Sequence, residues 1–184
     1  LGGAQEHFGV IPDLCTLGKI IGGGTPLGVI AGRESIMRLC DPTLKGNEEY
    51  VYQNGTLNGN PLSTAIALAT LDELAKPGTY ERLFANAQSL REGVGEVLRE
   101  EGVPAVCFGY GPMWHVLFAP QAPRNHRDVM SADTQAGLRF DQELIRQGVF
   151  VLPGTRRFIS TAHDDRDLED TFAAYRRAAR AFNA

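Results

Sequence analysis

Residues 9–28 have the sequence GVIPDLCTLGKIIGGGTPLG, which places one lysine between a short apolar segment and a glycine-rich turn. Leu17, Ile20 and Ile21 flank Lys19, so its ammonium is expected to lose water, which disfavours the charged form. A lysine in that state is a nucleophilic amine that can form a Schiff base with an aldehyde. The glycines that follow let the backbone approach a flat ligand closely. The stretch therefore predicts a site at which a cofactor is bound through a lysine.

Lys19 and its glycines have three other interpretations: a surface charge, a phosphate-binding loop and a dinucleotide-binding motif. A single lysine is most often a solvated surface charge. A phosphate-binding P-loop requires Ser or Thr after Gly18-Lys19 and a glycine five residues before Gly18, where the chain has Ile20 and Asp13. A dinucleotide-binding fingerprint requires glycine at Leu27. Both nucleotide motifs are excluded, and the solvated surface lysine remains the alternative.

Three blocks of the chain carry a family resemblance. They are residues 12–28 (PDLCTLGKIIGGGTPLG), 52–61 (YQNGTLNGNP) and 158–163 (FISTAH). In this order they resemble class III (fold type I) aminotransferases, which use pyridoxal 5′-phosphate. The opening residues 1–9 (LGGAQEHFG) narrow the resemblance toward the glutamate-1-semialdehyde 2,1-aminomutase branch. Because the blocks span nearly the whole chain, the resemblance is highly specific.

The resemblance implies an α/β fold that corresponds to the C-terminal portion of such an enzyme. We expect the C-terminal part of the fold type I large domain, followed by a small α+β C-terminal domain. The boundary is placed at Pro77-Gly78. Residues 1–76 are then a remnant of the large domain that binds pyridoxal phosphate, and residues 77–184 are the small domain.

The hydrophobic periodicity predicts the elements of both parts. In the first part we expect short buried strands at residues 11–17 and 27–31. A deeply buried helix is expected to start at Asn60, with Pro61 in its first position. In the second part we expect helices at residues 80–98, 134–147 and from Asp164 onward, and strands at 103–108, 113–119, 149–152 and 157–161.

The resemblance assigns roles to four residues. Lys19 matches the lysine that forms the Schiff base with the cofactor and then moves a proton between substrate and cofactor. Gly55 and Thr56 match a Gly-Thr pair that binds the cofactor phosphate across a dimer interface, which implies a homodimer with shared active sites. An ordinary Asn-Gly turn is the alternative for that pair. Arg157 is a weaker candidate for a contact to the substrate carboxylate, and a surface charge is the alternative.

The resemblance favours one reaction and leaves others open. The leading one converts glutamate-1-semialdehyde to 5-aminolevulinate, so the substrate is a small amino acid or amino aldehyde. An ordinary class III transaminase, a related racemase, and a non-catalytic dimerising fragment or paralogue stay open beside it. The family's pyridinium-binding aspartate and phosphate loop lie upstream of the segment that matches Leu1. We therefore expect this chain alone to bind the cofactor weakly and to be nearly inactive.

Composition excludes several other classes of protein. The chain has 184 residues, 43% of them hydrophobic, and a formal net charge of −4, which gives no basic surface for nucleic acid. No apolar run approaches the length of a membrane span. The three widely spaced cysteines (Cys15, Cys40 and Cys107) are expected to be reduced residues of the core in a cytoplasmic protein. His7, His115 and His126 lack metal-ligand spacing, so no metal site is expected.

Overall fold

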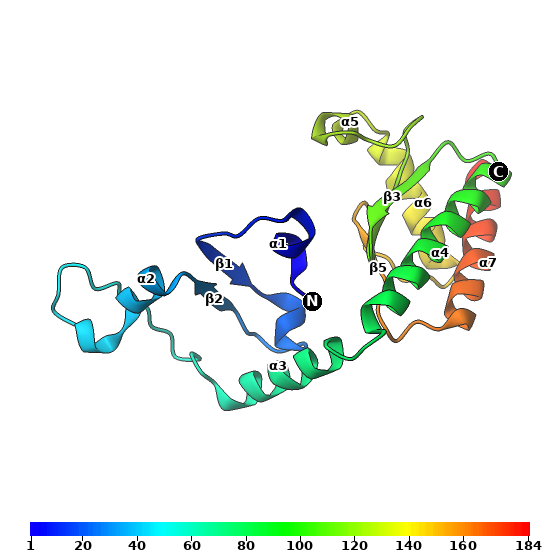
Figure 1. Cartoon of the computed structure of the whole chain (residues 1–184). Coiled ribbons are helices and arrows are strands. Elements are labelled where there is room, and N and C mark those ends of the chain that lie inside the picture. Colours follow the sequence, from blue (N-terminus) through cyan, green and yellow to red (C-terminus); the bar gives the residue numbers. More distant parts are fainter. The chain divides into compact units, whose positions relative to one another are not determined.

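The computed structural model describes all 184 residues and divides them into two compact units, Leu1–Thr79 and Tyr80–Ala184 (Figure 1). The expected boundary lay after residue 76. None of the helices is long and apolar enough to cross a membrane.

The N-terminal unit is built around one hairpin and one longer helix. Strands β1 (Leu14–Leu17) and β2 (Val29–Gly32) pair antiparallel, with Leu14 opposite Gly32 and Leu17 opposite Val29. The 3₁₀ helix η1 (Lys19–Gly22) follows β1 directly and packs against the longer helix α3 (Pro61–Leu74). The remaining elements are short: α1 (Gly3–Phe8), α2 (Glu34–Met37), η2 (Arg38–Cys40) and η3 (Pro42–Leu44).

Helix α3 begins where the sequence predicts. The Asn60 side chain accepts hydrogen bonds from the backbone N–H groups of Leu62 and Ser63, both at 3.1 Å, and Pro61 occupies the first turn. The expected deep burial of this helix is wrong, because Leu62 and Leu68 are 68% and 64% exposed.

The expected burial of the two strands in the N-terminal unit is also wrong. Most residues of β1 and β2 are exposed, and the buried residues of the unit are Gly22, Ser63, Ala67 and Thr79. A two-stranded ribbon with one helix has too few elements to cover its apolar faces. The three cysteines are free and half-buried, and Cys107 packs against the hydrophobic core of the C-terminal unit.

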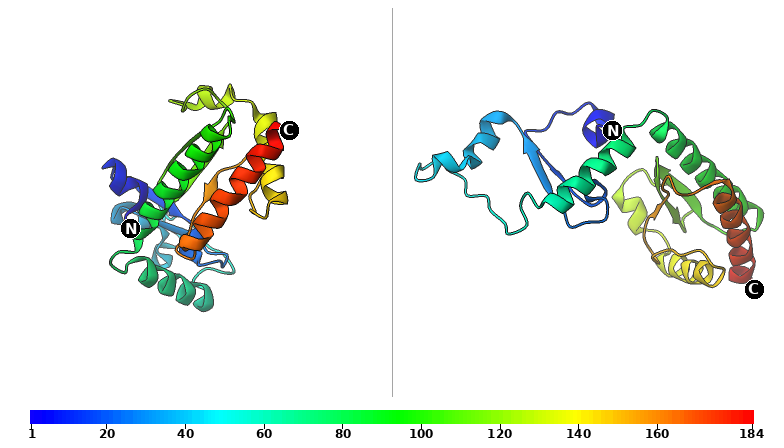
Figure 2. Two further views of the ribbon diagram at one scale, coloured as in Figure 1. Left: turned by 90° about the vertical axis from the view of Figure 1, so that its right-hand side faces the viewer. Right: turned by 90° about the horizontal axis from the view of Figure 1, so that it is seen from below.

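The C-terminal unit contains most of the hydrophobic core. Its three-stranded antiparallel sheet has the order β3 (Val106–Tyr110), β4 (Met113–Leu117), β5 (Arg157–Phe158). Helices α4 (Thr79–Glu100) and α7 (Asp165–Asn183) lie side by side (Figure 2), with α6 (Thr134–Arg146) packed on α7. The short helix α5 (His126–Met130) precedes α6.

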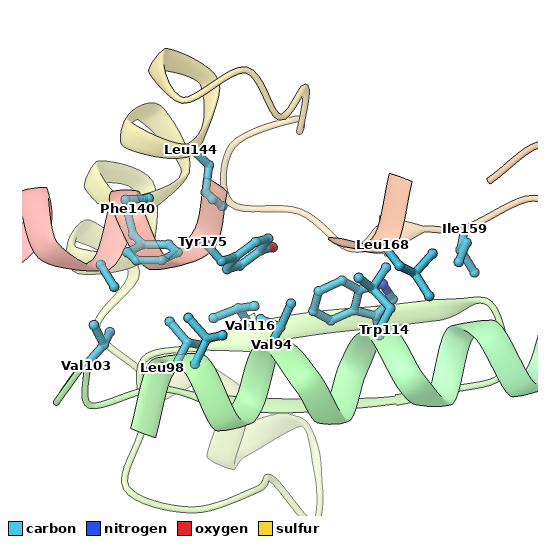
Figure 3. Packing of buried hydrophobic residues seen from close by; sticks show 14 of the residues in the cluster. Val94, Leu98, Val103, Trp114, Val116, Phe140, Leu144, Ile159, Leu168 and Tyr175 are labelled. Carbon is cyan, nitrogen blue, oxygen red and sulfur yellow. The ribbon is translucent and has the colours of Figure 1, made fainter. Parts of the chain in front are cut away.

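The core of this unit joins all three long helices to β4. Val94 and Leu98 of α4, Trp114 of β4, Phe140 of α6 and Tyr175 of α7 are at most 3% exposed (Figure 3).

The three helices expected in this unit are confirmed at their expected positions. The strand expected at residues 149–152 is not formed, and β5 contains only two of the five residues expected at 157–161. No strand of this chain pairs with residues 149–152 or 159–161.

Candidate functional site

Lys19 lies in a sharp turn at the end of β1. It is the first residue of η1 and has φ +57°, the only residue other than glycine with positive φ. Side chains rarely adopt this left-handed conformation, because Cβ approaches the following carbonyl oxygen. The turn thus holds the lysine in a conformation that the residue does not favour by itself.

Gly23 lies where the turn after Lys19 meets α3. It has φ +55°, and a Cβ atom added there would clash with Oγ1 of Thr70 and with the Ile66 side chain, both on α3. A side chain at this position would force the turn away from the helix. Gly23 is therefore required for the packing of η1 on α3 in this structure.

The amine of Lys19 is exposed and unpaired. The side chain forms no ion pair or hydrogen bond, and its neighbours Leu17 and Ile20 are 43% and 67% exposed. The expected loss of water around Lys19 is therefore not found, because nothing in the N-terminal unit covers these apolar neighbours. The amine of Lys19 is solvated and unpaired in this structure, as the surface-charge alternative predicts.

The strain at Lys19 has a measurable consequence. Replacing Lys19 with glycine is expected to leave the N-terminal unit about 1 kcal/mol more stable than replacing it with alanine, because only alanine keeps the left-handed penalty. Urea unfolding followed by circular dichroism would measure the difference. Lys45 has φ −57° and provides the matched pair of control variants, for which glycine should give no advantage over alanine. Equal stability of the two Lys19 variants would contradict the left-handed assignment.

Gly55 and Thr56 lie in a tight turn shortly before α3. The Gly55 N–H donates to Oδ1 of Asn54 at 2.8 Å, and its carbonyl accepts from the N–H of Asn58 at 2.9 Å. The hydroxyl and backbone N–H of Thr56 form no hydrogen bond and are exposed. These two donors are available to an anion. The structure shows no hydrogen bond between this turn and Lys19, although the two segments belong to the same unit as α3.

Arg157 lies in the interior of the C-terminal unit, so the surface-charge interpretation is wrong. Its Nε donates to the Tyr175 hydroxyl at 2.8 Å, and one of its terminal nitrogens forms a buried ion pair with Asp141. The other donates to the Thr155 carbonyl at 3.3 Å. Its guanidinium carbon lies 5.7 Å from the ring centroid of Trp114. The cation is thus held by partners within its own unit.

The surroundings of this ion pair shift the pKa values of Tyr175 and Arg157. Burial raises the pKa of Tyr175 to about 12, although Arg157 opposes the shift. Burial by itself would lower the pKa of Arg157, but the neighbouring Tyr175 and Asp141 raise it above its usual value. Asp141 also accepts a hydrogen bond from the Gly154 N–H at 2.8 Å. Tyr175 and Arg157 therefore keep their protons throughout the physiological range.

Asp141 is a residue that the sequence interpretation missed. It is 2% exposed and fixes both Arg157 and the backbone at Gly154. A signal existed in the helical stripe of Ala136, Phe140 and Leu144, since Asp141 lies beside it on the buried side of α6. A carboxylate in such a position requires a buried partner.

The fold and the lysine segment define the class of this protein. Residues 3–163 match the model of a family described as aminotransferase class III. The chain belongs to the class III aminotransferase family. The expected α/β fold, corresponding to the C-terminal portion of these enzymes, is confirmed by solved structures that match almost the whole chain.

Curated relatives point to one branch of the family. The chain is 38% identical over 177 residues to the glutamate-1-semialdehyde 2,1-aminomutase of Methanosarcina acetivorans and 39% identical to that of Methanococcoides burtonii. Each alignment covers 95% of this chain and 40% of the relative. The chain thus spans about 40% of the length of the curated relatives it matches.

Solved structures include members of two branches. An omega-transaminase from Sphaerobacter thermophilus matches with a TM-score of 0.91 and 33% identity, over 100% of this chain and 42% of the other. A glutamate-1-semialdehyde-aminomutase from Pseudomonas aeruginosa, a lysine-to-alanine variant in complex with PMP, matches with a TM-score of 0.80 and 26% identity, over 96% and 40%. PMP is the amino form of pyridoxal phosphate, so the expected cofactor is supported at the level of the family.

Proposed function

We propose that this chain contributes the reactive lysine to a pyridoxal-phosphate-dependent enzyme that transfers amino groups. The most favoured reaction is that of a glutamate-1-semialdehyde 2,1-aminomutase, which forms 5-aminolevulinate. The observation that carries the proposal is the position of Lys19, which lies in a left-handed turn inside the segment that matches the family and has an amine that no side chain pairs. The curated relatives at 38% and 39% identity support the aminomutase branch.

The residues present fit part of the cofactor. Lys19 offers a free amine for the cofactor aldehyde, and Thr56 offers a free hydroxyl and N–H for the phosphate dianion. When bound, the cofactor supplies an electron-withdrawing ring for the chemistry at the substrate carbon. Lys19 would hold it covalently and then carry a proton as a general base, a role typically worth about 10²–10⁴-fold in rate.

Two further features belong to the proposal. The Gly55–Thr56 turn would bind the phosphate of the cofactor held by Lys19 of a neighbouring subunit. The active protein would then be a homodimer with shared active sites. Arg157 remains a candidate substrate contact. Its internal bonds to Asp141 and Tyr175 mean that a substrate carboxylate would have to share a guanidinium that is already occupied.

An ordinary transaminase is the second candidate. The match to the omega-transaminase, with a TM-score of 0.91 and 33% identity, favours it over a racemase or a non-catalytic paralogue. An aminomutase needs no second amino acceptor, whereas a transaminase transfers the amino group to an added keto acid or aldehyde. Dependence of turnover on an added acceptor therefore separates the two reactions.

Reductive trapping tests the proposed role of Lys19. The chain contains three lysines, Lys19, Lys45 and Lys76. After incubation with pyridoxal phosphate and borohydride reduction, peptide mapping should place the phosphopyridoxyl group mainly on Lys19. Thr56→Val should weaken the cofactor affinity about tenfold, since a hydrogen bond to a charged group is lost.

The controls for trapping come from the same chain. Lys19→Ala should abolish the selective label, and Lys45→Ala should leave it unchanged. Equal labelling of all three lysines would contradict the assignment of Lys19, because it would show only the general reactivity of exposed amines.

A further inference from the structure

The stretch before α3 contains two asparagines that are each followed by a glycine. They are Asn54, followed by Gly55, and Asn58, followed by Gly59. Residues 51–59 are exposed and form no helix or strand. Asparagine is a chemically labile residue, and a following glycine has no Cβ to hinder attack of its backbone nitrogen on the asparagine side chain. By sequence alone the two positions are equivalent.

The side chain of Asn54 lies against the nitrogen that would attack it. The Gly55 N–H donates to Oδ1 of Asn54 at 2.8 Å, and Nδ2 of Asn54 donates to the Tyr52 hydroxyl at 2.7 Å. The amide is therefore held at both ends beside Gly55. The backbone N–H and carbonyl of Asn54 form no hydrogen bond, so the turn can make the small rotation that brings Cγ to the Gly55 nitrogen. Groups held side by side in this way gain reaction rate from proximity.

Asn58 is held in a different way. Its N–H donates to the Gly55 carbonyl at 2.9 Å, and the next turn is closed by the Asn60 N–H, which donates to the Leu57 carbonyl at 3.1 Å. The Nδ2 of Asn58 donates to Oε1 of Gln53 at 3.1 Å. Its amide is thus bonded to a residue that precedes it in the chain, and two turns fix the backbone around it. The structure therefore favours reaction at the first of the two asparagines.

We propose that Asn54 is a site of spontaneous deamidation in the folded chain. The Gly55 nitrogen forms a bond to Cγ of Asn54 and releases its proton to water. The bond from Cγ to Nδ2 breaks, and that nitrogen takes up a proton from water and leaves as ammonia. One water molecule then opens the cyclic imide at either of its carbonyl groups, which gives aspartate or isoaspartate. The reaction needs no enzyme, oxidant or reductant.

The modification changes the turn that contains Gly55 and Thr56. A carboxylate replaces a neutral amide two residues before Thr56, and isoaspartate also adds a methylene carbon to the backbone there. A negative charge at this point would oppose the phosphate of the cofactor. This consequence rests on the proposed function, whereas the modification itself needs only this chain and water. Failure of the proposed function would therefore leave the modification unchanged.

Peptide mapping by mass spectrometry tests the site. The folded 184-residue chain is incubated at neutral pH in heavy-oxygen water, so that each carboxylate formed during the incubation carries the isotope. Asn54 should be converted about tenfold faster than Asn58, because only the Asn54 amide is held beside the nitrogen that follows it.

The same chain in urea provides the control. Once the turns are unfolded, the two Asn-Gly pairs should react at equal rates, since no fixed contact then distinguishes them. Asn54→Gln should abolish the isotope at residue 54, because a longer side chain closes the ring less readily, and should leave the rate at Asn58 unchanged. Equal rates at Asn54 and Asn58 in the folded chain would overturn the proposal. A folded chain in which Asn54 stays unmodified while the unfolded chain reacts would overturn it as well.

Discussion

Asp141→Ala is expected to lower the free energy of unfolding of the C-terminal unit by about 3–5 kcal/mol, because it leaves the buried guanidinium of Arg157 without its counter-ion. The side chains of Asp141 and Arg157 are only 3% and 6% exposed, so solvent cannot replace the lost carboxylate. The Gly154 N–H also loses its acceptor. Urea unfolding followed by Trp114 fluorescence would measure the change, since the Trp114 ring lies against Arg157.

A second substitution tests the origin of this loss. In the double variant Asp141→Ala with Arg157→Met, no buried charge is left unpaired, so much of the stability should return. Asp170→Ala removes an exposed carboxylate whose partner is Arg166, and it should have little measurable effect. If the double variant were as unstable as Asp141→Ala, the loss would come from packing at residue 141 and not from the unpaired charge.

The elements that the sequence predicted well are those with local signals. The Asn60-Pro61 start of α3 depends on one side chain and one fixed φ angle, and both act within a single turn. Helices α4, α6 and α7 each carry a stripe of apolar residues with helical period. The Asp164 cap of α7, which forms a capping box with Asp167, is equally local.

The expectations that were wrong all depend on contacts with segments that are distant in the sequence. The segment 149–152 has the composition of a strand, but a strand exists only where another strand pairs with it. The apolar neighbours of Lys19 and the apolar faces of α3 were expected to be buried for the same reason. Composition shows that these residues favour burial, and it does not show which segment would cover them.

The features of the candidate site also differ in whether they depend on nearby or distant residues. Lys19 and the Gly55-Thr56 turn could be chosen from the sequence because their motifs are contiguous. The left-handed conformation of Lys19 could not, since a lysine gives no local signal for positive φ. The burial of Arg157 depends on Asp141 and Tyr175, which lie 16 and 18 residues away in the chain. Such a pairing follows from the packing of α6, β5 and α7.

Phe140→Ala is expected to lower the free energy of unfolding by about 3–5 kcal/mol, through the lost transfer energy and the cavity left behind. Phe140 is fully buried, and its ring lies 5.6 Å from Phe118, 5.9 Å from Tyr175 and 5.6 Å from Phe182, measured between centroids. These rings come from the segment after β4 and from α7, so the truncation loosens contacts of several elements with α6 at once.

Phe150→Ala is the matched control, because it deletes the same side chain at a position that is 91% exposed. Little apolar surface is removed from water there, so the change should stay within about 0.5 kcal/mol. Urea unfolding of both variants at two protein concentrations would decide the comparison. A large loss for Phe150→Ala that shrinks on dilution would mean that a second copy covers this residue in solution. A small loss for Phe140→Ala would contradict the core described for the C-terminal unit.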